Sequence, residues 1–234
     1  MPTDFRLKQF WIRQQNSPIP MGTDALLLGS WVESEQPQHI LDIGTGTGIL
    51  ALMQAQKYPQ AQIEALEPEP QAAEQAQENF KASAWEERLQ LRQLKLQDYR
   101  PERAFDLILS NPPYFEPYTL SPEPARARGR SSLDLSWKDI LAFAKDGLTP
   151  QGQLALILPA ETETTVRQAA QAQGFYLNAL CRVSGQAGKK PIRILMSWQK
   201  MPSWPREQTL SIREGKVHST AYLDLVKDFF PGSL

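Results

Sequence analysis

The chain has 234 residues and a formal net charge of −1, with 41% hydrophobic and 22% charged residues, which is typical of one α/β domain with extensions. It contains no run of about 18 apolar residues and no apolar N-terminal core, so the sequence predicts neither a membrane span nor a secretory signal. The single Cys181 excludes an internal disulfide, and with only His39 and His218 we expect no metal site. These features favour a cytoplasmic protein.

Three segments are predicted in chain order. Residues 1–34 form an N-terminal lid or cap segment, irregular at first and then with a short helix that Thr23 or Asp24 caps. Residues 35–200 form the main domain. Residues 201–234 form a C-terminal extension packed on the same domain, with a linker over 201–207 and a short helix over 222–230.

Apolar runs and helical spacing alternate through the main domain. The expected strands cover 39–44, 63–67, 89–94, 105–109, 152–158, 175–183 and 192–199, and the expected helices cover 49–56, 70–81, 137–147 and 161–173. This order predicts an α/β fold with a doubly wound, mostly parallel seven-stranded sheet. The last two strands are expected to form an antiparallel edge pair.

A glycine run, Asp42-x-Gly44-x-Gly46-x-Gly48, joins the first strand to its helix. Its spacing differs from the dinucleotide-binding G-x-G-x-x-G, and no Gly-Lys-Ser/Thr of a phosphate loop follows. Glycines let the backbone pass close to a ligand without interference from a Cβ. The strand, turn and helix resemble motif I of the class I S-adenosylmethionine-dependent methyltransferases. The resemblance implies a Rossmann-like fold and S-adenosylmethionine as cofactor, held by Asp42, Gly44, Thr45, Gly46 and Gly48.

Two acids follow the next two strands. Glu67 ends the second strand, where its two carboxylate oxygens can accept hydrogen bonds from both ribose hydroxyls of a nucleoside. Asp98 follows the third strand, and by the same family resemblance it accepts from the adenine amino group of the cofactor. Glu67 and Asp98 are therefore added to the candidate cofactor residues.

The stretch Asn111-Pro112-Pro113-Tyr114 ends the fourth strand. It resembles motif IV of methyltransferases that modify exocyclic or amide nitrogens. The amide oxygen of Asn111 and the carbonyl of Pro112 can accept hydrogen bonds from a target amino group, while Pro113 stiffens the tip and Tyr114 can stack on a flipped base. These four residues are the candidate catalytic set, and Asn111 also borders the cofactor.

The whole chain resembles a narrower family, the bacterial tRNA(Val) (adenine-N6)-methyltransferases, which modify the adenine beside the anticodon. Residues that carry this resemblance include Phe5-Arg6-x-Lys8-Gln9-Phe10, Met21-Gly22-Thr23-Asp24, Ser110-Asn111-Pro112-Pro113-Tyr114-Phe115, Ala127-Arg128 and Lys190-Pro191-x-Arg193. The resemblance implies an enzyme that methylates an adenine amino group in tRNA and releases S-adenosylhomocysteine. The candidate RNA-binding residues are Tyr114, Phe115, Arg126, Arg128, Arg130, Lys189, Lys190 and Arg193.

Three alternatives remain from the residues alone. Motifs of this kind also serve release-factor methyltransferases, which modify a protein glutamine, and enzymes that modify a guanine amino group of ribosomal RNA. A cofactor-binding RNA-interaction protein without turnover is the non-enzymatic alternative, although the intact Asn111-Pro112-Pro113-Tyr114 argues against it.

Overall fold

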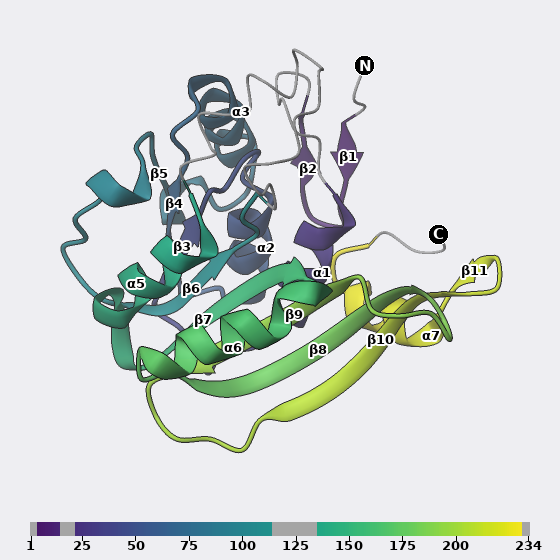
Figure 1. Cartoon of the computed structure of the whole chain (residues 1–234). Helices are drawn as coiled ribbons and strands as arrows, with labels where there is room; N and C mark the ends of the chain where they lie inside the picture. The colour runs from purple at the N-terminus through teal and green to yellow at the C-terminus, as the bar shows by residue number, and fades with distance from the viewer. Residues whose placement is uncertain (1–3, 15–21, 114–134, 231–234) are drawn as a thin grey trace, which may run out of the picture.

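The structure is a computed structural model that describes residues 4–14, 22–113 and 135–230. A nine-stranded sheet runs through it in the order β11-β10-β8-β9-β7-β6-β3-β4-β5 (Figure 1). Its strands are β3 (His39–Ile43), β4 (Gln62–Leu66), β5 (Leu89–Arg92), β6 (Phe105–Ser110), β7 (Leu148–Pro159), β8 (Tyr176–Gln186), β9 (Arg193–Gln199), β10 (Arg206–Glu214) and β11 (Val217–His218). Neighbouring strands are parallel except that β9 opposes β7 and β8, and β11 opposes β10.

The two faces of the sheet carry separate apolar layers. Ile40 of β3 faces a layer that includes residues of α1 (Thr23–Trp31), α2 (Ile49–Lys57), α3 (Pro70–Lys81) and α7 (Thr220–Val226). Leu41, its neighbour, faces the layer built with α5 (Trp137–Gly147) and α6 (Glu163–Ala172). Because side chains of a strand alternate between faces, a strand covered on both sides must be apolar, as the buried part of β3 from Ile40 to Ile43 is apart from Asp42.

All seven predicted strands lie in the sheet, and the α/β class is confirmed. The sheet has two strands more than predicted, since β10 and β11 come from the segment expected to be an extension. The β8–β9 pair is therefore antiparallel but not at the edge. The sequence did not reveal β10 because only Leu210 in it is buried, so its pattern is that of a polar, exposed segment.

The N-terminal segment contains a short hairpin in place of the predicted irregular chain. Its strands β1 (Phe5–Arg6) and β2 (Trp11–Ile12) have two residues each, too few for a periodic signal. The Lys8 backbone N–H donates to the carbonyl of Phe229 at 2.8 Å, and the Phe5 and Phe230 rings meet edge to face. Both ends of the described chain thus pack together. Among the described residues, no helix has the length and apolarity that crossing a membrane requires.

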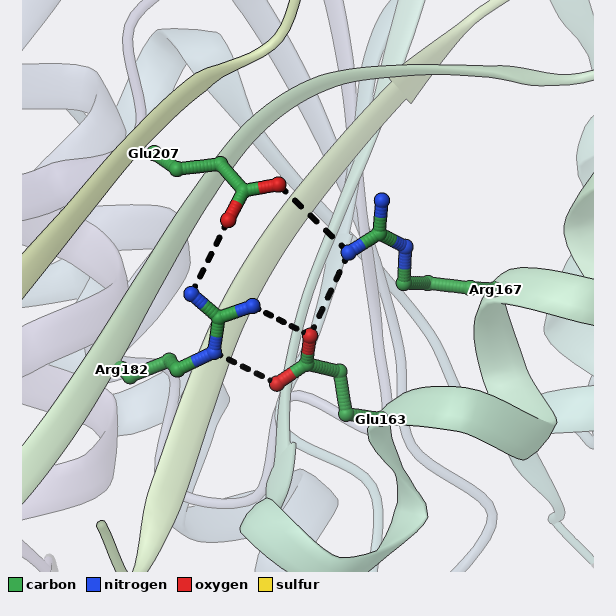
Figure 2. A network of polar contacts seen from close by, with 4 residues as sticks. All are labelled: Glu163, Arg167, Arg182 and Glu207. Atoms are coloured by element: carbon green, nitrogen blue, oxygen red, sulfur yellow. Dashed lines mark hydrogen bonds and ion pairs between the residues drawn. The ribbon is translucent and has the colours of Figure 1, made fainter.

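A network of four charged side chains joins α6, β8 and β10 (Figure 2). Arg182 donates twice to Glu163, at 2.6 and 2.8 Å, and once to Glu207 at 2.9 Å. Arg167 adds longer contacts to both acids, at 3.3 and 3.5 Å. The hydrogen bonds from Arg182 lower the pKa of Glu163. Arg182 is therefore the centre of the network, and it fastens the polar strand β10 to the sheet.

We expect Arg182→Ala to lower the free energy of unfolding at pH 7 by roughly 1–2 kcal/mol, since it removes charge-assisted bonds that are partly shielded from water. Arg167→Ala, with longer and more exposed contacts, should cost less than about 1 kcal/mol. The folded-state pKa of Glu163 lies below its ordinary value of 4.5. The stabilisation of the folded state by the Glu163–Arg182 pair is therefore complete above pH 4.5 and is lost as the pH falls through the folded-state pKa. Urea unfolding at pH 7 and pH 3 measures this. Equal effects of the two substitutions, or no loss of effect at pH 3, would contradict it.

Candidate active site

The carboxyl ends of β3 and β6 lie side by side at the point where the strand order reverses. The strands that follow β3 in the chain, β4 and β5, lie on one side of it, whereas β6 and then β7 lie on the other. Ligands of open α/β sheets bind at such a switch point. The Ser110 hydroxyl, at the end of β6, donates to the carbonyl of Ile43, at the end of β3, at 2.6 Å. The structure thus brings the predicted glycine turn and the Asn111 tip together.

The glycine turn follows β3 with three left-handed residues: the φ angles are 72° at Gly44, 57° at Gly46 and 85° at Gly48. The N–H groups of Gly44 and Thr45 both donate to the carbonyl of Leu66, which fixes the turn against the end of β4. A Cβ at Gly46 would meet no atom of the described residues within 4 Å. A Cβ at Gly48 would lie 2.5 Å from the ring of Phe80. Gly48 therefore allows α2 to pack against α3, whereas Gly46 offers its surface to a ligand.

Asp42 lies beneath the turn and is completely buried. Its Oδ2 accepts from the Thr45 hydroxyl at 2.5 Å and from the Ala51 N–H at 3.1 Å, while its Oδ1 has no hydrogen-bond partner among the described residues. Burial raises the pKa of Asp42 to about 7, and these two hydrogen bonds act against that rise. The hydrogen bonds of Asp42 with Thr45 and Ala51 therefore stabilise the turn from beneath.

Glu67 directly follows β4 and faces the same turn. Its Oε2 accepts from the Gly46 N–H at 2.9 Å, and its Oε1 accepts from the Glu69 N–H at 3.0 Å. The residue is only 5% exposed, and burial raises the pKa of its carboxyl. Each carboxylate oxygen retains one acceptor site, so the group can still receive two hydroxyl donors.

A small cavity adjoins the turn at Gly44. Its lining includes Gly44 and Leu66 together with Leu96 and Gln97 of the 3₁₀ helix η2 (Leu96–Asp98). Asp98, predicted to read the cofactor's adenine, ends this helix but is exposed and does not line the cavity. The element that carries Asp98 thus reaches the site, while its carboxylate lies outside the cavity.

The tip after β6 places Pro112 in the interior, with Asn111 and Pro113 partly exposed on either side of it. The burial of Pro112 and the Ser110 hydrogen bond hold the strand end rigidly. Tyr114 and Phe115, predicted to stack on the target base, lie outside the described residues. So do Arg126, Arg128 and Arg130 of the predicted basic loop.

The residues of the second predicted basic cluster, Lys189, Lys190 and Arg193, lie in different surroundings. Lys189 and Lys190 are exposed in the turn between β8 and β9, at the same edge of the sheet as the switch point, because Arg193 pairs with Pro159 at the end of β7. Arg193 itself donates through Nε to Asp24 Oδ2 at 2.8 Å. Arg193, which we predicted to bind phosphate, ties β9 to the first turn of α1 in the structure. Among the described residues, no three His, Cys, Asp or Glu side chains form a metal-binding group.

Comparisons with known proteins agree with this geometry. Residues 18–173 match the family model of the methyltransferase small domain. The chain is 40% identical over 228 residues to the tRNA1(Val) (adenine(37)-N6)-methyltransferase of Tolumonas auensis, covering 97% of this chain and 96% of the relative. It is 38% identical over 226 residues to the protein of the same name from Vibrio vulnificus, covering 97% and 95%. It belongs to this methyltransferase family.

The solved structures agree on the fold. A "predicted O-methyltransferase" from Agrobacterium tumefaciens superposes with a TM-score of 0.66 at 19% identity, covering 88% of this chain and 96% of that one. At that identity the likeness concerns the fold alone. The predicted family and its class I methyltransferase fold are thus both confirmed, whereas the roles of individual site residues stay predictions.

Sequence reasoning missed the residue that braces the turn from the side. Asn79 of α3 is 1% exposed, and its Nδ2 donates to the carbonyls of Thr47, at 2.8 Å, and Arg13, at 2.9 Å. Its Oδ1 accepts from the Arg13 N–H. The sequence carried no distinctive signal, because α3 contains three glutamines besides Asn79, and an amide in a helix does not by itself indicate a contact across the chain.

The two glycines of the turn are expected to respond differently to alanine. Gly48→Ala places a methyl group against buried Phe80 at positive φ and should cost roughly 2–4 kcal/mol of unfolding free energy. Gly46→Ala meets no atom, so it should cost only about 1 kcal/mol while weakening the binding of S-adenosylhomocysteine more than tenfold, about 1.4 kcal/mol. Denaturant unfolding and calorimetric titration measure the two effects. The reverse order of stabilities would contradict these roles.

Asp42 should make the stability of the free protein depend on pH. Its folded-state pKa of about 7 exceeds its ordinary value of 3.8, so the folded state binds more protons between these values and loses stability as the pH rises. Asp42→Asn removes this titration. Relative to the variant, the wild type should therefore lose unfolding free energy between pH 4 and pH 7, measured by urea unfolding. Parallel pH profiles of the two proteins would rule this out.

Proposed function

We propose that this protein transfers the methyl group of S-adenosylmethionine to the N6 amino group of adenine 37 in tRNA1(Val) and releases S-adenosylhomocysteine. The observation that carries the proposal is the pairing of strand ends that sets the Asn111-Pro112-Pro113 tip beside the glycine turn. Relatives that are 37–40% identical over 97% of the chain bear the name of this activity.

The residues around the turn fit the cofactor. No described atom lies near a Cβ placed at Gly46, Glu67 is held toward the turn with acceptor capacity left, and a small hollow lined in part by Leu66 and Leu96 adjoins Gly44. We assign Gly44 and Gly46 to close backbone approach, Glu67 to the ribose hydroxyls, and η2 with Asp98 to the adenine end. S-adenosylmethionine supplies an electrophilic methyl group on a sulfonium.

The tip supplies the geometry for the acceptor. The Asn111 side-chain oxygen and the Pro112 carbonyl accept the two hydrogens of the adenine amino group, which turns the nitrogen lone pair toward the methyl donor. The same two oxygens stabilise the positive charge that develops on the nitrogen as the bond to carbon forms. The extra proton then leaves to solvent, since the charged nitrogen is acidic enough to need no strong base. We assign Tyr114 and Phe115 to stacking on the base.

We assign the exposed lysine side chains at the carboxyl end of the sheet to contacts with the RNA. Lys189 and Lys190 are exposed at that edge and fit phosphate contacts. From the sequence, Arg126, Arg128 and Arg130 are proposed to contribute in the same way. Arg193, predicted from the sequence to belong to the same set, is bonded to Asp24 in the structure.

Asn111→Ala tests the catalytic assignment. Transfer to a tRNA1(Val) transcript should fall by about two to three orders of magnitude in kcat, the usual cost of losing one transition-state hydrogen bond, while the affinity for S-adenosylhomocysteine holds. Single-turnover transfer and calorimetry measure the two. Asn178→Ala is the matched control, because Asn178 lies near the start of β8 and bonds only Ser197 among the described residues.

The same assay identifies the acceptor. Mass mapping of the wild-type product should place the methyl group on N6 of adenine 37, and a transcript with guanine at that position should gain none. Methyl transfer to a protein glutamine or to guanine in ribosomal RNA, with none to tRNA, would overturn the proposal, as would near-normal turnover of Asn111→Ala.

A further inference from the structure

The N-terminal hairpin has one buried face and one exposed face. Leu7, Phe10 and Ile12 point inward and are at most 5% exposed. The outward set alternates with them and consists of Asp4, Arg6, Lys8, Gln9, Trp11 and Arg13, all exposed. With three cations, one acid and one indole, the face has a net positive charge and is also aromatic.

Trp11 is the largest side chain of this face and is 55% exposed. The guanidinium carbon of Arg6 lies 5.5 Å from the centroid of its ring system, a cation–π contact that restrains the indole. Phe10 and Ile12 already anchor the hairpin in the core, so the fold does not need Trp11 for burial. An exposed, restrained indole is a platform on which a planar group can stack.

The hairpin is fastened directly to the candidate active site. The Asn79 side chain exchanges hydrogen bonds with the backbone N–H and carbonyl of Arg13 and also donates to the carbonyl of Thr47, inside the glycine turn. A single amide therefore separates the end of β2 from the cofactor turn. The Phe10 ring also meets Trp85 edge to face at 5.6 Å. The exposed face thus has a defined position at the edge where methyl transfer is proposed.

The chemistry of this face favours a polyanion with planar groups. Among the described residues, no acid forms an ion pair with Arg6, Lys8 or Arg13, so their charges remain available to a ligand. An apolar protein partner would fit three unpaired cations around the indole poorly. Single-stranded RNA matches both properties, because its bases stack on aromatic rings and its phosphates attract cations.

We propose that the exposed face of the β1–β2 hairpin is a tRNA contact surface, on which Trp11 stacks against an unpaired nucleobase while Arg6, Lys8 and Arg13 contact the backbone phosphates. The inference rests on the proposed function, since it extends the same tRNA site from the sheet edge onto the N-terminal segment.

The test compares Trp11→Ala, Trp11→Phe and Trp204→Ala in the full chain. Trp204 is the matched control: it is 96% exposed and lies between β9 and β10 at the opposite edge of the sheet. Losing one stacked base should raise the KM for tRNA and weaken tRNA binding about tenfold in Trp11→Ala, with kcat and cofactor affinity held. Trp11→Phe keeps a ring and should stay within about threefold of the wild type, as should Trp204→Ala.

A second measurement tests the cations. In Lys8→Gln/Arg13→Gln, the slope of log binding constant against log salt should become shallower by about 1–2, in proportion to the lost phosphate contacts. An unchanged slope would remove the phosphate contacts from the proposal.

The outcomes separate this inference from the proposed function. An unchanged KM and tRNA affinity in Trp11→Ala would overturn the inference, and so would a variant that loses only thermal stability and cofactor affinity. If the wild type binds tRNA but methylates none, the proposed function fails, while weaker binding by Trp11→Ala would still support the hairpin surface. A wild type that binds no tRNA overturns both.

Discussion

The parallel pairing of β3 with β6 sets the geometry of the candidate site. These strands are separated by more than sixty residues in the chain, yet Ile40 to Asp42 lie opposite Leu107 to Leu109. The pairing sets the two strand ends side by side, and the Ser110 hydroxyl joins them. A rigid glycine turn and a rigid Asn-Pro-Pro tip then meet without either having to move. A preorganised arrangement of this kind spares the reaction the cost of orienting donor and acceptor.

Two buried carboxylates hold the turn from different positions. Asp42 holds it from below through Thr45 and Ala51, and Glu67 meets it from the side through the Gly46 N–H. Burial raises the pKa of both groups, and Glu67 adds to the rise for Asp42 through charge repulsion. A positively charged ligand beside the turn favours the ionised forms. Cofactor binding and the protonation of these acids are therefore expected to be coupled.

The segments outside the central α/β unit join the site by specific contacts. Asp24 of α1 holds Arg193 at the start of β9, and Asn79 joins the N-terminal hairpin to the glycine turn. The same hairpin bonds the C-terminal segment through Lys8 and Phe229. These contacts surround the strand ends with surfaces that the sheet alone does not supply. Recognition of a large substrate can thus rest on elements whose sequences carry little periodic signal.

The α/β class, the central strands, the glycine turn and the Asn-Pro-Pro tip could all be predicted from the sequence, because each depends on local patterns. Apolar runs and glycines or prolines at fixed spacing, such as Gly44 to Gly48 or Pro112-Pro113, have the same consequence wherever they occur. The sequence could not show that Arg193 pairs with Asp24, that Asp42 lies beneath the turn, or that β10 joins the sheet. Those outcomes depend on neighbours far away in the chain: a polar strand such as β10 is recruited by its partner β8 and by Arg182, not by its own hydrophobicity.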